Sequence, residues 1–119
     1  MRIPAKSDYA LRALVAIAAA GDGYVKAEAL SDAEAIPFEY LQNILRDLRR
    51  AGLLRAQRGY EGGYRLSRPA AAISVSDVLE AVASPLTEPY ARSGSVWDAL
   101  ETSTRDLLGS TTVADLVVS

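Results

Sequence analysis

The fold is decided by residues 37–66, which read PFEYLQNILRDLRRAGLLRAQRGYEGGYRL. The first half predicts an amphipathic helix, because leucine and isoleucine recur at the spacing of one helical face. That face holds Leu41, Ile44, Leu45 and Leu48, whereas the opposite face holds Glu39, Gln42, Asn43, Arg46 and Arg50. Pro37 suits the first position of a helix, and Gly52 suits its end. We therefore expect one helix between these two residues, with a polar and largely hydrogen-bonding outer face.

The second half of the same stretch predicts a β-hairpin. Apolar and polar residues alternate from Leu54 to Arg58 and alternate again over residues 64–67. Between these two runs lies Gly59-Tyr60-Glu61-Gly62-Gly63, whose glycines permit the positive φ angles of a tight turn. The glycine spacing matches neither known phosphate-binding loop, and a strand rather than a helix follows. A nucleotide site is therefore not expected there.

Helical patterns precede this unit. Ser7 is expected to cap a first helix that stops at Gly21, and a short second helix is expected over residues 26–33. The second helix is expected to bury Val25, Ala29 and Leu30. Three helices followed by a hairpin is the element order of a winged helix-turn-helix. In that fold the third helix enters the DNA major groove, and the hairpin contacts neighbouring phosphates or the minor groove.

Three more helices are predicted after residue 70. Each opens with a Ser/Thr-x-x-Asp sequence that resembles a capping box, at Ser74, Ser95 and Thr112. The first is expected to end near Pro85 and to bury Val75, Val78, Leu79 and Val82. The second is expected to end before Gly109, and the last to run from Val113 to about Val118. Residues 83–94 contain prolines and show no periodicity, which predicts a loop.

The predicted fold is mainly α with a small two-stranded antiparallel hairpin, a winged helix-turn-helix followed by a C-terminal dimerisation helix. Within one compact domain, residues 1–69 are expected to bind DNA, and residues 70–119 to form a helical region for dimerisation and effector response. The helix that begins at Ser95 has an apolar stripe, and one short helix after it is too small to cover both of its faces. We therefore expect a homodimer interface made by Val96, Trp97, Leu100, Thr104, Leu107 and Leu108. The alternative is that these side chains belong to the core of a single chain.

The composition excludes several classes of function. The chain has 119 residues and a net charge of -2, with neither cysteine nor histidine. It therefore lacks the side chains of a thiol nucleophile, a Ser-His-Asp triad, a zinc site or an ordinary iron–sulfur cluster. An enzyme is not expected, and neither is a cofactor. The longest apolar run, residues 13–20, is too short to cross a bilayer, and no signal-peptide pattern opens the sequence. A soluble cytoplasmic protein is expected.

The small net charge conceals a basic half and an acidic half. Residues 1–69 carry 11 basic and 8 acidic side chains, whereas residues 70–119 carry 2 basic and 7 acidic ones. Seven arginines lie close together, at Arg46, Arg49, Arg50, Arg55, Arg58, Arg65 and Arg68. On the predicted fold they lie on the helix and hairpin that meet DNA, which favours double-stranded DNA over a merely solvated surface. The amides of Gln42 and Asn43 suit the edges of adenine.

Much of the chain resembles a known family, the winged-helix regulators that include IscR, NsrR and CymR. The matching residues are 1–3, 6–14, 36–41, 48–53, 58–66, 68–69, 73–82 and 112–116. The resemblance implies a homodimeric transcription regulator, usually a repressor, whose long penultimate helix forms much of the dimer interface. It implies DNA contacts by Arg2, Lys6, Pro37, Glu39, Tyr40, Gln42 and Asn43, with Arg58 and the tip residues Gly59, Tyr60, Gly62 and Gly63 in the minor groove. The predicted fold adds Arg46, Arg49 and Arg50 on the recognition helix.

The chain departs from this family in one respect. Cluster-binding relatives carry three cysteines between the fourth helix and the dimerisation helix, whereas residues 84–95 hold none here. Asp8 matches a position that supplies a cluster ligand in some relatives, but an acid that compensates the helix dipole is the better interpretation. We expect a cluster-free regulator that responds to a small molecule or a protein partner near residues 85–94. Two alternatives stay open: a winged helix that binds an acidic protein, and an iron–sulfur sensor whose cysteine-bearing segment is missing from this short interval.

Overall fold

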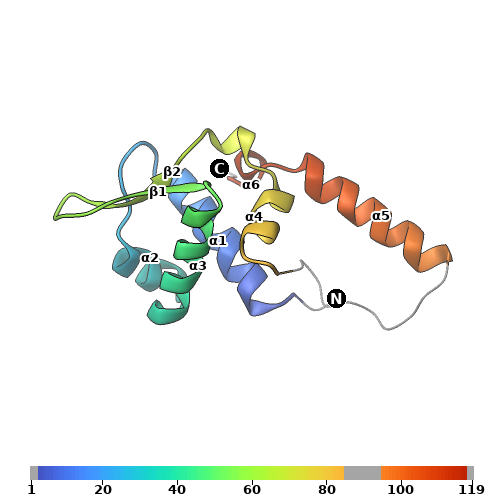
Figure 1. The fold of residues 1–119 in the computed structure, drawn as a ribbon, viewed down its shortest axis with the longest axis horizontal. Coiled ribbons are helices and arrows are strands. Elements are labelled where there is room, and N and C mark those ends of the chain that lie inside the picture. Colours follow the sequence, from blue (N-terminus) through green and yellow to red (C-terminus); the bar gives the residue numbers. More distant parts are fainter. Residues whose placement is uncertain (1–2, 85–94, 118–119) are drawn as a thin grey trace.

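The computed structural model describes residues 3–84 and 95–117, with only the backbone described for 95–98 (Figure 1). The elements are α1 (Ala5–Ala19), α2 (Ala27–Glu34), α3 (Phe38–Arg50), β1 (Leu54–Gln57), β2 (Gly63–Leu66), the 3-10 turn η1 (Ala70–Ala72), α4 (Val75–Ala81), α5 (Ser95–Ser110) and α6 (Val113–Leu116). This order of three helices, a hairpin and further helices confirms the predicted fold class. The division into a DNA-binding and a dimerisation region stays a prediction.

The hydrophobic core forms where α1 packs against α3, α4 and α6. Helix α1 contributes Leu14 and Ile17, and α3 contributes the predicted stripe Leu41, Ile44, Leu45 and Leu48, each at most 1% exposed. Burying a leucine side chain contributes about 1.5–3 kcal/mol, so this stripe holds α3 against the core. Because one face of α3 is buried in this way, its polar face points to solvent.

Strands β1 and β2 form an antiparallel hairpin, which we call the wing. Its register pairs Leu54 with Leu66, Arg55 with Arg65, Ala56 with Tyr64 and Gln57 with Gly63. The chain just before α2 joins the edge of the wing, because Val25 and Tyr64 exchange two backbone hydrogen bonds of 2.8 Å each. The wing therefore extends from the helical core as a continuation of the helix-turn-helix (Figure 1).

The C-terminal segment is held on the core by local caps and by one bridge. Capping boxes are present at Ser74 and Thr112, as predicted. These two residues form an isolated antiparallel bridge that joins the start of α6 to the start of α4. Helix α5 instead projects away from the core in Figure 1. Within the described ranges, none of the helices has the length and apolar character that a membrane span requires.

Several local predictions are wrong. Helix α4 ends at Ala81 rather than near Pro85, because Ala83 takes a positive φ of 49° that turns the chain out of the helix. Ser7 does not cap α1, because the helix begins directly after Pro4 and Ser7 lies inside it, fully buried, with its hydroxyl 2.6 Å from the hydroxyl of Ser84. Ala29 is exposed, since the short α2 turns only Leu30 fully into the core. Helix α5 does not stop before Gly109 but continues to Ser110, because this glycine keeps a negative φ and the helical conformation. Of the predicted loop at residues 83–94, residues 83 and 84 are described and non-helical, and residues 85–94 lie outside the described residues.

Candidate nucleic-acid interface

The outer face of α3 carries the side chains predicted to read DNA. Glu39, Gln42, Asn43, Arg46, Arg49 and Arg50 are all exposed. The Oδ1 atom of Asn43 accepts a hydrogen bond from Nη1 of Arg46 at 3.2 Å, so these two side chains are held together on the surface. Amides and guanidiniums of this kind can bond to base edges and to phosphates. The face thus has the chemistry of a recognition helix.

The start of α3 is positioned by α1. Pro37 occupies the N-cap and is exposed, and Tyr40 is 38% exposed in the first turn. The ring of Tyr40 meets the ring of Tyr9 edge to face, with centroids 5.4 Å apart and planes at 87°. The guanidinium of Arg12 lies 5.6 Å from the centroid of the Tyr9 ring. These ring contacts link the first turn of α3 to α1.

Arg12 also fixes α1 to α2. Its Nη1 donates to Oδ2 of Asp8 at 3.0 Å, its Nε donates to Oε1 of Glu34 at 3.4 Å, and its Nη2 donates to the carbonyl oxygen of Glu34. The hydrogen bond to Asp8 is the main reason that the pKa of Arg12 is raised above its ordinary value. Arg12 therefore stays charged at any physiological pH. Asp8 holds its side chain within α1, and the bonds to Glu34 tie α1 to α2.

Two further residues predicted to contact DNA lie near the start of the chain. Lys6 is partly exposed, and its Nζ atom lies 3.7 Å from Oδ2 of Asp47 on α3. Its charge is therefore partly compensated within the protein. Arg2 lies outside the described residues. The contribution of both residues to DNA binding stays a prediction.

The wing tip is exposed, and it contains a tight turn that requires glycine. Arg58, Gly59 and Tyr60 are exposed, and 89% of the Tyr60 surface is accessible. Gly62 is buried, and its N–H donates to the carbonyl oxygen of Gly59 at 3.0 Å. A Cβ atom at Gly62 would overlap the backbone of Gln57. A side chain at this position would therefore force the turn open.

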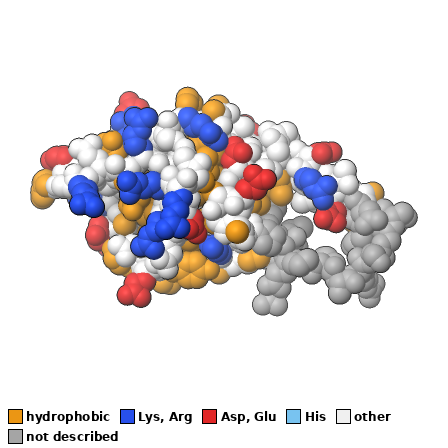
Figure 2. Space-filling model, in the orientation of Figure 1, with side chains coloured by type: hydrophobic (Ala, Val, Ile, Leu, Met, Phe, Trp, Pro, Cys, Tyr) orange, Lys and Arg blue, Asp and Glu red, His pale blue; other side chains and the backbone are white. Residues whose placement is uncertain are grey.

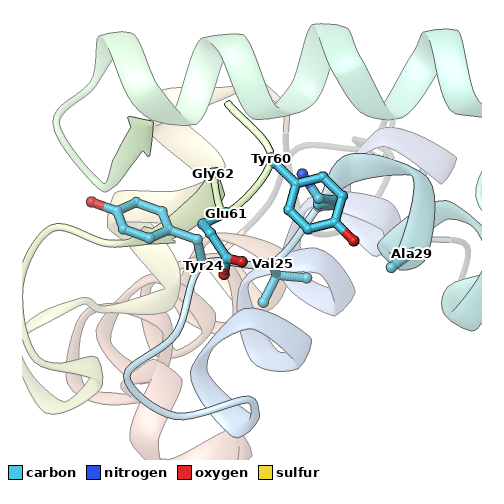
Figure 3. A pocket seen from close by; sticks show the side chains of 7 residues that line it. Tyr24, Val25, Ala29, Tyr60, Glu61 and Gly62 are labelled. Atoms are coloured by element: carbon cyan, nitrogen blue, oxygen red, sulfur yellow. The ribbon is translucent and has the colours of Figure 1, made fainter. Parts of the chain in front are cut away.

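A shallow groove of about 380 Å³ separates the wing tip from α2. Figure 3 shows Tyr24 and Tyr60 on opposite sides of the groove, with Val25 and Glu61 between them. Lys26 bridges it, because its Nζ atom lies 3.4 Å from the carbonyl oxygen of Gly59 and 5.9 Å from the centroid of the Tyr60 ring. These contacts hold the wing tip beside the N-terminus of α2.

The basic side chains separate into paired and unpaired groups. Among the described residues, Lys6, Arg12, Arg68 and Arg105 form ion pairs with acids. In the same part of the chain, the cations without an acidic partner are Lys26, Arg46, Arg49, Arg50, Arg55, Arg58 and Arg65. All of the unpaired ones lie on α3, on the wing or beside it. Figure 2 shows Lys and Arg side chains gathered over this end of the molecule. Uncompensated positive charge is thus concentrated where a polyanion would be recognised.

Helix α5 exposes the apolar residues predicted to form a dimer interface. Leu100 is 53% exposed and Leu107 is 62% exposed, two helical turns apart and hence on one face. Thr104 is exposed between them, with its hydroxyl bonded to the carbonyl oxygen of Leu100 at 2.9 Å, and Leu108 is half-buried. The side chains of Val96 and Trp97 lie outside the described residues. An apolar stripe is thus exposed, and its role as an interface stays a prediction.

The predicted contact set does not include several residues that position the side chains of this candidate interface. Tyr9, Tyr24 and Lys26 contact Tyr40, Arg65 and the wing tip, which lie on other elements. No local sequence pattern indicates contacts between distant elements. Arg55 and Arg65 were placed in the wing but not among the contacts. The sequence does contain a signal for this pair. A five-residue glycine-rich turn between the two alternating runs fixes the strand register, and that register places Arg55 opposite Arg65.

A family model described as Rrf2, iron-dependent transcriptional regulator, matches residues 3–119. The chain is an Rrf2-family transcriptional regulator. This finding confirms the resemblance to IscR and CymR. The matched relatives and structures are transcriptional regulators rather than enzymes, so this Rrf2 chain carries a DNA-binding fold in a family that acts on transcription.

Individual relatives resemble this Rrf2-family chain over nearly its full length. Rv1287 of Mycobacterium tuberculosis, named as an HTH-type transcriptional regulator, is 42% identical over 130 aligned positions, which cover 98% of this chain and 81% of that protein. The structure of CymR, the global cysteine regulator of B. subtilis, has a TM-score of 0.85 at 26% identity, covering 98% of this chain and 96% of CymR. T. potens IscR also has a TM-score of 0.85, at 29% identity, covering 98% of this chain and 86% of IscR.

The donor set of this Rrf2-family chain does not fit an iron–sulfur cluster. The sequence contains no cysteine and no histidine. Asp8, the predicted counterpart of a cluster ligand, is bound by Arg12. No three acidic side chains within residues 3–84 and 99–117 gather as a metal site would require. One carboxylate without thiolates cannot hold such a cluster.

Proposed function

We propose that this Rrf2-family regulator is a homodimeric repressor that binds operator DNA in a sequence-specific manner and carries no cluster. The observation that carries the proposal is that, among the described residues, the cations without an acidic partner all lie on α3, on the wing or beside it. Phosphate contacts supply much of the affinity of a protein for DNA, and they require cations that are not already neutralised. Helix α3 would enter the major groove, and the wing tip would approach the adjacent minor groove.

Base reading is assigned to the exposed polar face of α3. Gln42 and Asn43 offer amides that can form paired hydrogen bonds to adenine, and Glu39 can accept from cytosine. The bond from Arg46 orients the amide of Asn43, leaving its NH₂ group directed to other acceptors. Pro37 and Tyr40 would fix the start of the helix against the DNA backbone. Sequence preference would then reside in three side chains of each protomer.

Dimerisation is assigned to α5. A stripe with Leu100 and Leu107 more than half exposed is typical of a helix that packs against another copy. Two protomers would present two recognition helices, and a palindromic operator with half-sites spaced by whole turns of DNA would match them. Repression would follow if the operator overlaps a promoter.

The regulatory signal is assigned to a small molecule or a protein partner near residues 85–94. This part of the proposal depends on the absence of thiolate and imidazole ligands from the sequence. An effector would have to bind the DNA-competent and incompetent states with different affinities to switch the dimer. Calorimetric titration with candidate metabolites, in the presence and absence of operator DNA, tests this part. Equal DNA affinity under every condition argues against an effector of that class.

Selection of genomic DNA by the purified protein tests DNA recognition. We expect an enriched palindrome, and the position of the palindrome relative to promoters reports the sign of regulation. If four or five arginines of each protomer neutralise phosphates, the slope of log K against log salt should be about -8 for the dimer. A slope near zero would contradict DNA binding and favour a winged helix that binds an acidic protein.

The double variant Leu100→Glu/Leu107→Glu tests the dimer. Two carboxylates in an apolar interface should produce a monomer in analytical ultracentrifugation and weaken operator binding, while far-UV circular dichroism stays unchanged. Thr102→Glu is the matched control, because Thr102 is an exposed residue of α5 on a different face. A double variant that remains dimeric contradicts the assignment of α5.

A further inference from the structure

The face of the wing that is turned away from the core carries a pair of arginines. Arg55 on β1 and Arg65 on β2 are register partners. Residues directly opposite on antiparallel strands leave the same face of the sheet, with Cβ atoms about 4.5–5.5 Å apart. Leu54 and Leu66 point the other way, into or against the core. The two guanidiniums therefore share the outer face of the wing.

This pair is not neutralised by the protein. Within the described residues, neither Arg55 nor Arg65 forms an ion pair. The guanidinium carbon of Arg65 lies 5.5 Å from the centroid of the Tyr24 ring, which holds the side chain without cancelling its charge. Like charges directly opposite each other destabilise a strand pair. An anion placed between the two guanidiniums would remove this repulsion.

We propose that Arg55 and Arg65 form a phosphate clamp that holds the DNA backbone beside the wing tip. The clamp rests on the proposed function, since it needs bound DNA. Arg58 at the tip lies three positions after Arg55, so the pair lies about 10 Å behind the tip at a strand rise of about 3.3 Å per residue. At this distance from the tip, the pair would face the DNA phosphate backbone that borders the minor groove entered by the tip. A guanidinium group can donate two parallel hydrogen bonds to phosphate oxygens, and the ring of Tyr24 already holds the guanidinium of Arg65 in place before DNA binds.

A clamp on the backbone has a distinct functional signature. Phosphate contacts position a protein on DNA but carry no sequence information. The clamp should therefore strengthen operator and non-operator binding by the same factor. It should also hold the wing in register with α3, whose side chains do the base reading. Its charge-bearing residues should be dispensable for folding, because they repel each other in the free protein.

The test measures the salt dependence of DNA binding for the double variant Arg55→Gln/Arg65→Gln. The probes are a 30-base-pair operator duplex and a scrambled duplex, titrated by fluorescence anisotropy from 0.05 to 0.4 M KCl. One phosphate per protomer corresponds to a loss of about 1.8 from the magnitude of the dimer slope. If the curves meet near 1 M salt, this corresponds to about 60-fold weaker binding at 0.1 M, equal on both duplexes. Arg68→Gln is the matched control, because Arg68 is paired with Asp77 at 3.3 Å, and its slope should stay unchanged.

Urea unfolding without DNA separates a clamp from a structural role. The double variant should be as stable as the wild-type protein or more stable, whereas a structural role predicts lower stability. A matched pair of titrations in potassium phosphate and in KCl, at equal ionic strength, distinguishes DNA phosphate from a free anion. Selective stabilisation of the wild type by free phosphate, with an unchanged DNA slope, would overturn the DNA clamp.

The remaining outcomes are also decisive. A slope that is unchanged in the double variant, with normal operator binding by the wild type, overturns the clamp and leaves the proposed function intact. A wild-type protein that binds neither duplex overturns the proposed function itself. Weaker binding confined to the operator would show that the pair reads sequence, which also contradicts a backbone clamp.

Discussion

Replacing Gly63 by alanine should destabilise the wing strongly, because of both its backbone conformation and its close neighbours. Its φ of +147° lies in a region that side chains with a Cβ atom rarely adopt. Holding a non-glycine residue in such a region costs about 1–3 kcal/mol. The new Cβ atom would also lie 2.5 Å from the carbonyl oxygen of Val25. Because this neighbour is backbone, the alanine can be accommodated only if the chain before α2 moves away.

That movement breaks the link between the wing and the helix-turn-helix. Val25 and Tyr64 exchange two backbone hydrogen bonds of 2.8 Å, and both depend on the present separation of the two segments. Each bond contributes about 0.5–1.5 kcal/mol. Together with the strain, the expected loss in the free energy of unfolding is about 2–6 kcal/mol if both bonds are lost. A domain of this size has a total stability of about 5–15 kcal/mol, so the effect is large.

Urea denaturation followed by circular dichroism measures this loss, at one fixed protein concentration because the protein is proposed to be a dimer. Two other glycines serve as matched controls. Gly59 has a φ of +104°, but no atom lies within 4 Å of the position that its Cβ atom would take, so Gly59→Ala should show only the strain. Gly23 has neither feature, and Gly23→Ala should be neutral or stabilising by about 0.4–1 kcal/mol. Hydrogen exchange at the amides of Val25 and Tyr64 detects local detachment of the wing.

The expected order of destabilisation is therefore Gly63, then Gly59, then Gly23. If Gly63→Ala unfolds at the same urea concentration as Gly23→Ala and keeps both amides protected, the reasoning is refuted. A loss of equal size for Gly59→Ala and Gly63→Ala would show that strain acts alone and that the contact with Val25 is relieved without cost.

Further predictions concern a helix cap, base reading and the wing. Ser74→Ala removes the bond that the Ser74 hydroxyl accepts from the N–H of Asp77 in the α4 capping box, and should cost about 0.5–2 kcal/mol in urea unfolding. Ser76→Ala should cost less, and equal losses contradict the role of the cap. Gln42→Ala should weaken operator binding by about 1–3 kcal/mol in anisotropy titrations without affecting a scrambled duplex; equal losses on both would exclude base reading. Tyr24→Leu should weaken binding to both duplexes about two- to fivefold, because Arg65 loses its cation–π contact with the Tyr24 ring. An unchanged affinity contradicts a role for this contact in positioning Arg65.

Local chemistry made much of the fold predictable. The helix at residues 38–50 follows from the spacing of Leu41, Ile44, Leu45 and Leu48, because a helix with that pattern has one face to bury. The caps at Ser74 and Thr112 depend on bonds to residues three positions away, so a four-residue pattern contains all the necessary information. The hairpin follows from alternation around a glycine-rich turn.

The wrong predictions concern residues whose environment comes from distant parts of the chain. Ser7 has the residue type of a helix cap, but Pro4 already starts the helix and the packing of α1 against the end of α4 buries Ser7 beside Ser84. Ala29 has the spacing of a core residue, but it lines the open groove between the wing tip and α2 and is exposed. Sequence spacing describes which side of a helix a residue occupies. It does not describe what lies opposite.

The same distinction applies to the candidate DNA interface. The sequence by itself determined that arginines crowd the third helix and the hairpin, because residue order fixes the element on which each one lies. Only the tertiary structure decided which charges are available: Lys6 and Arg68 are paired with acids on other elements, whereas Arg55 and Arg65 are left facing each other. The physical reason is that charge compensation depends on distances of about 3–4 Å between side chains from separate elements, and those distances exist only after the elements have packed.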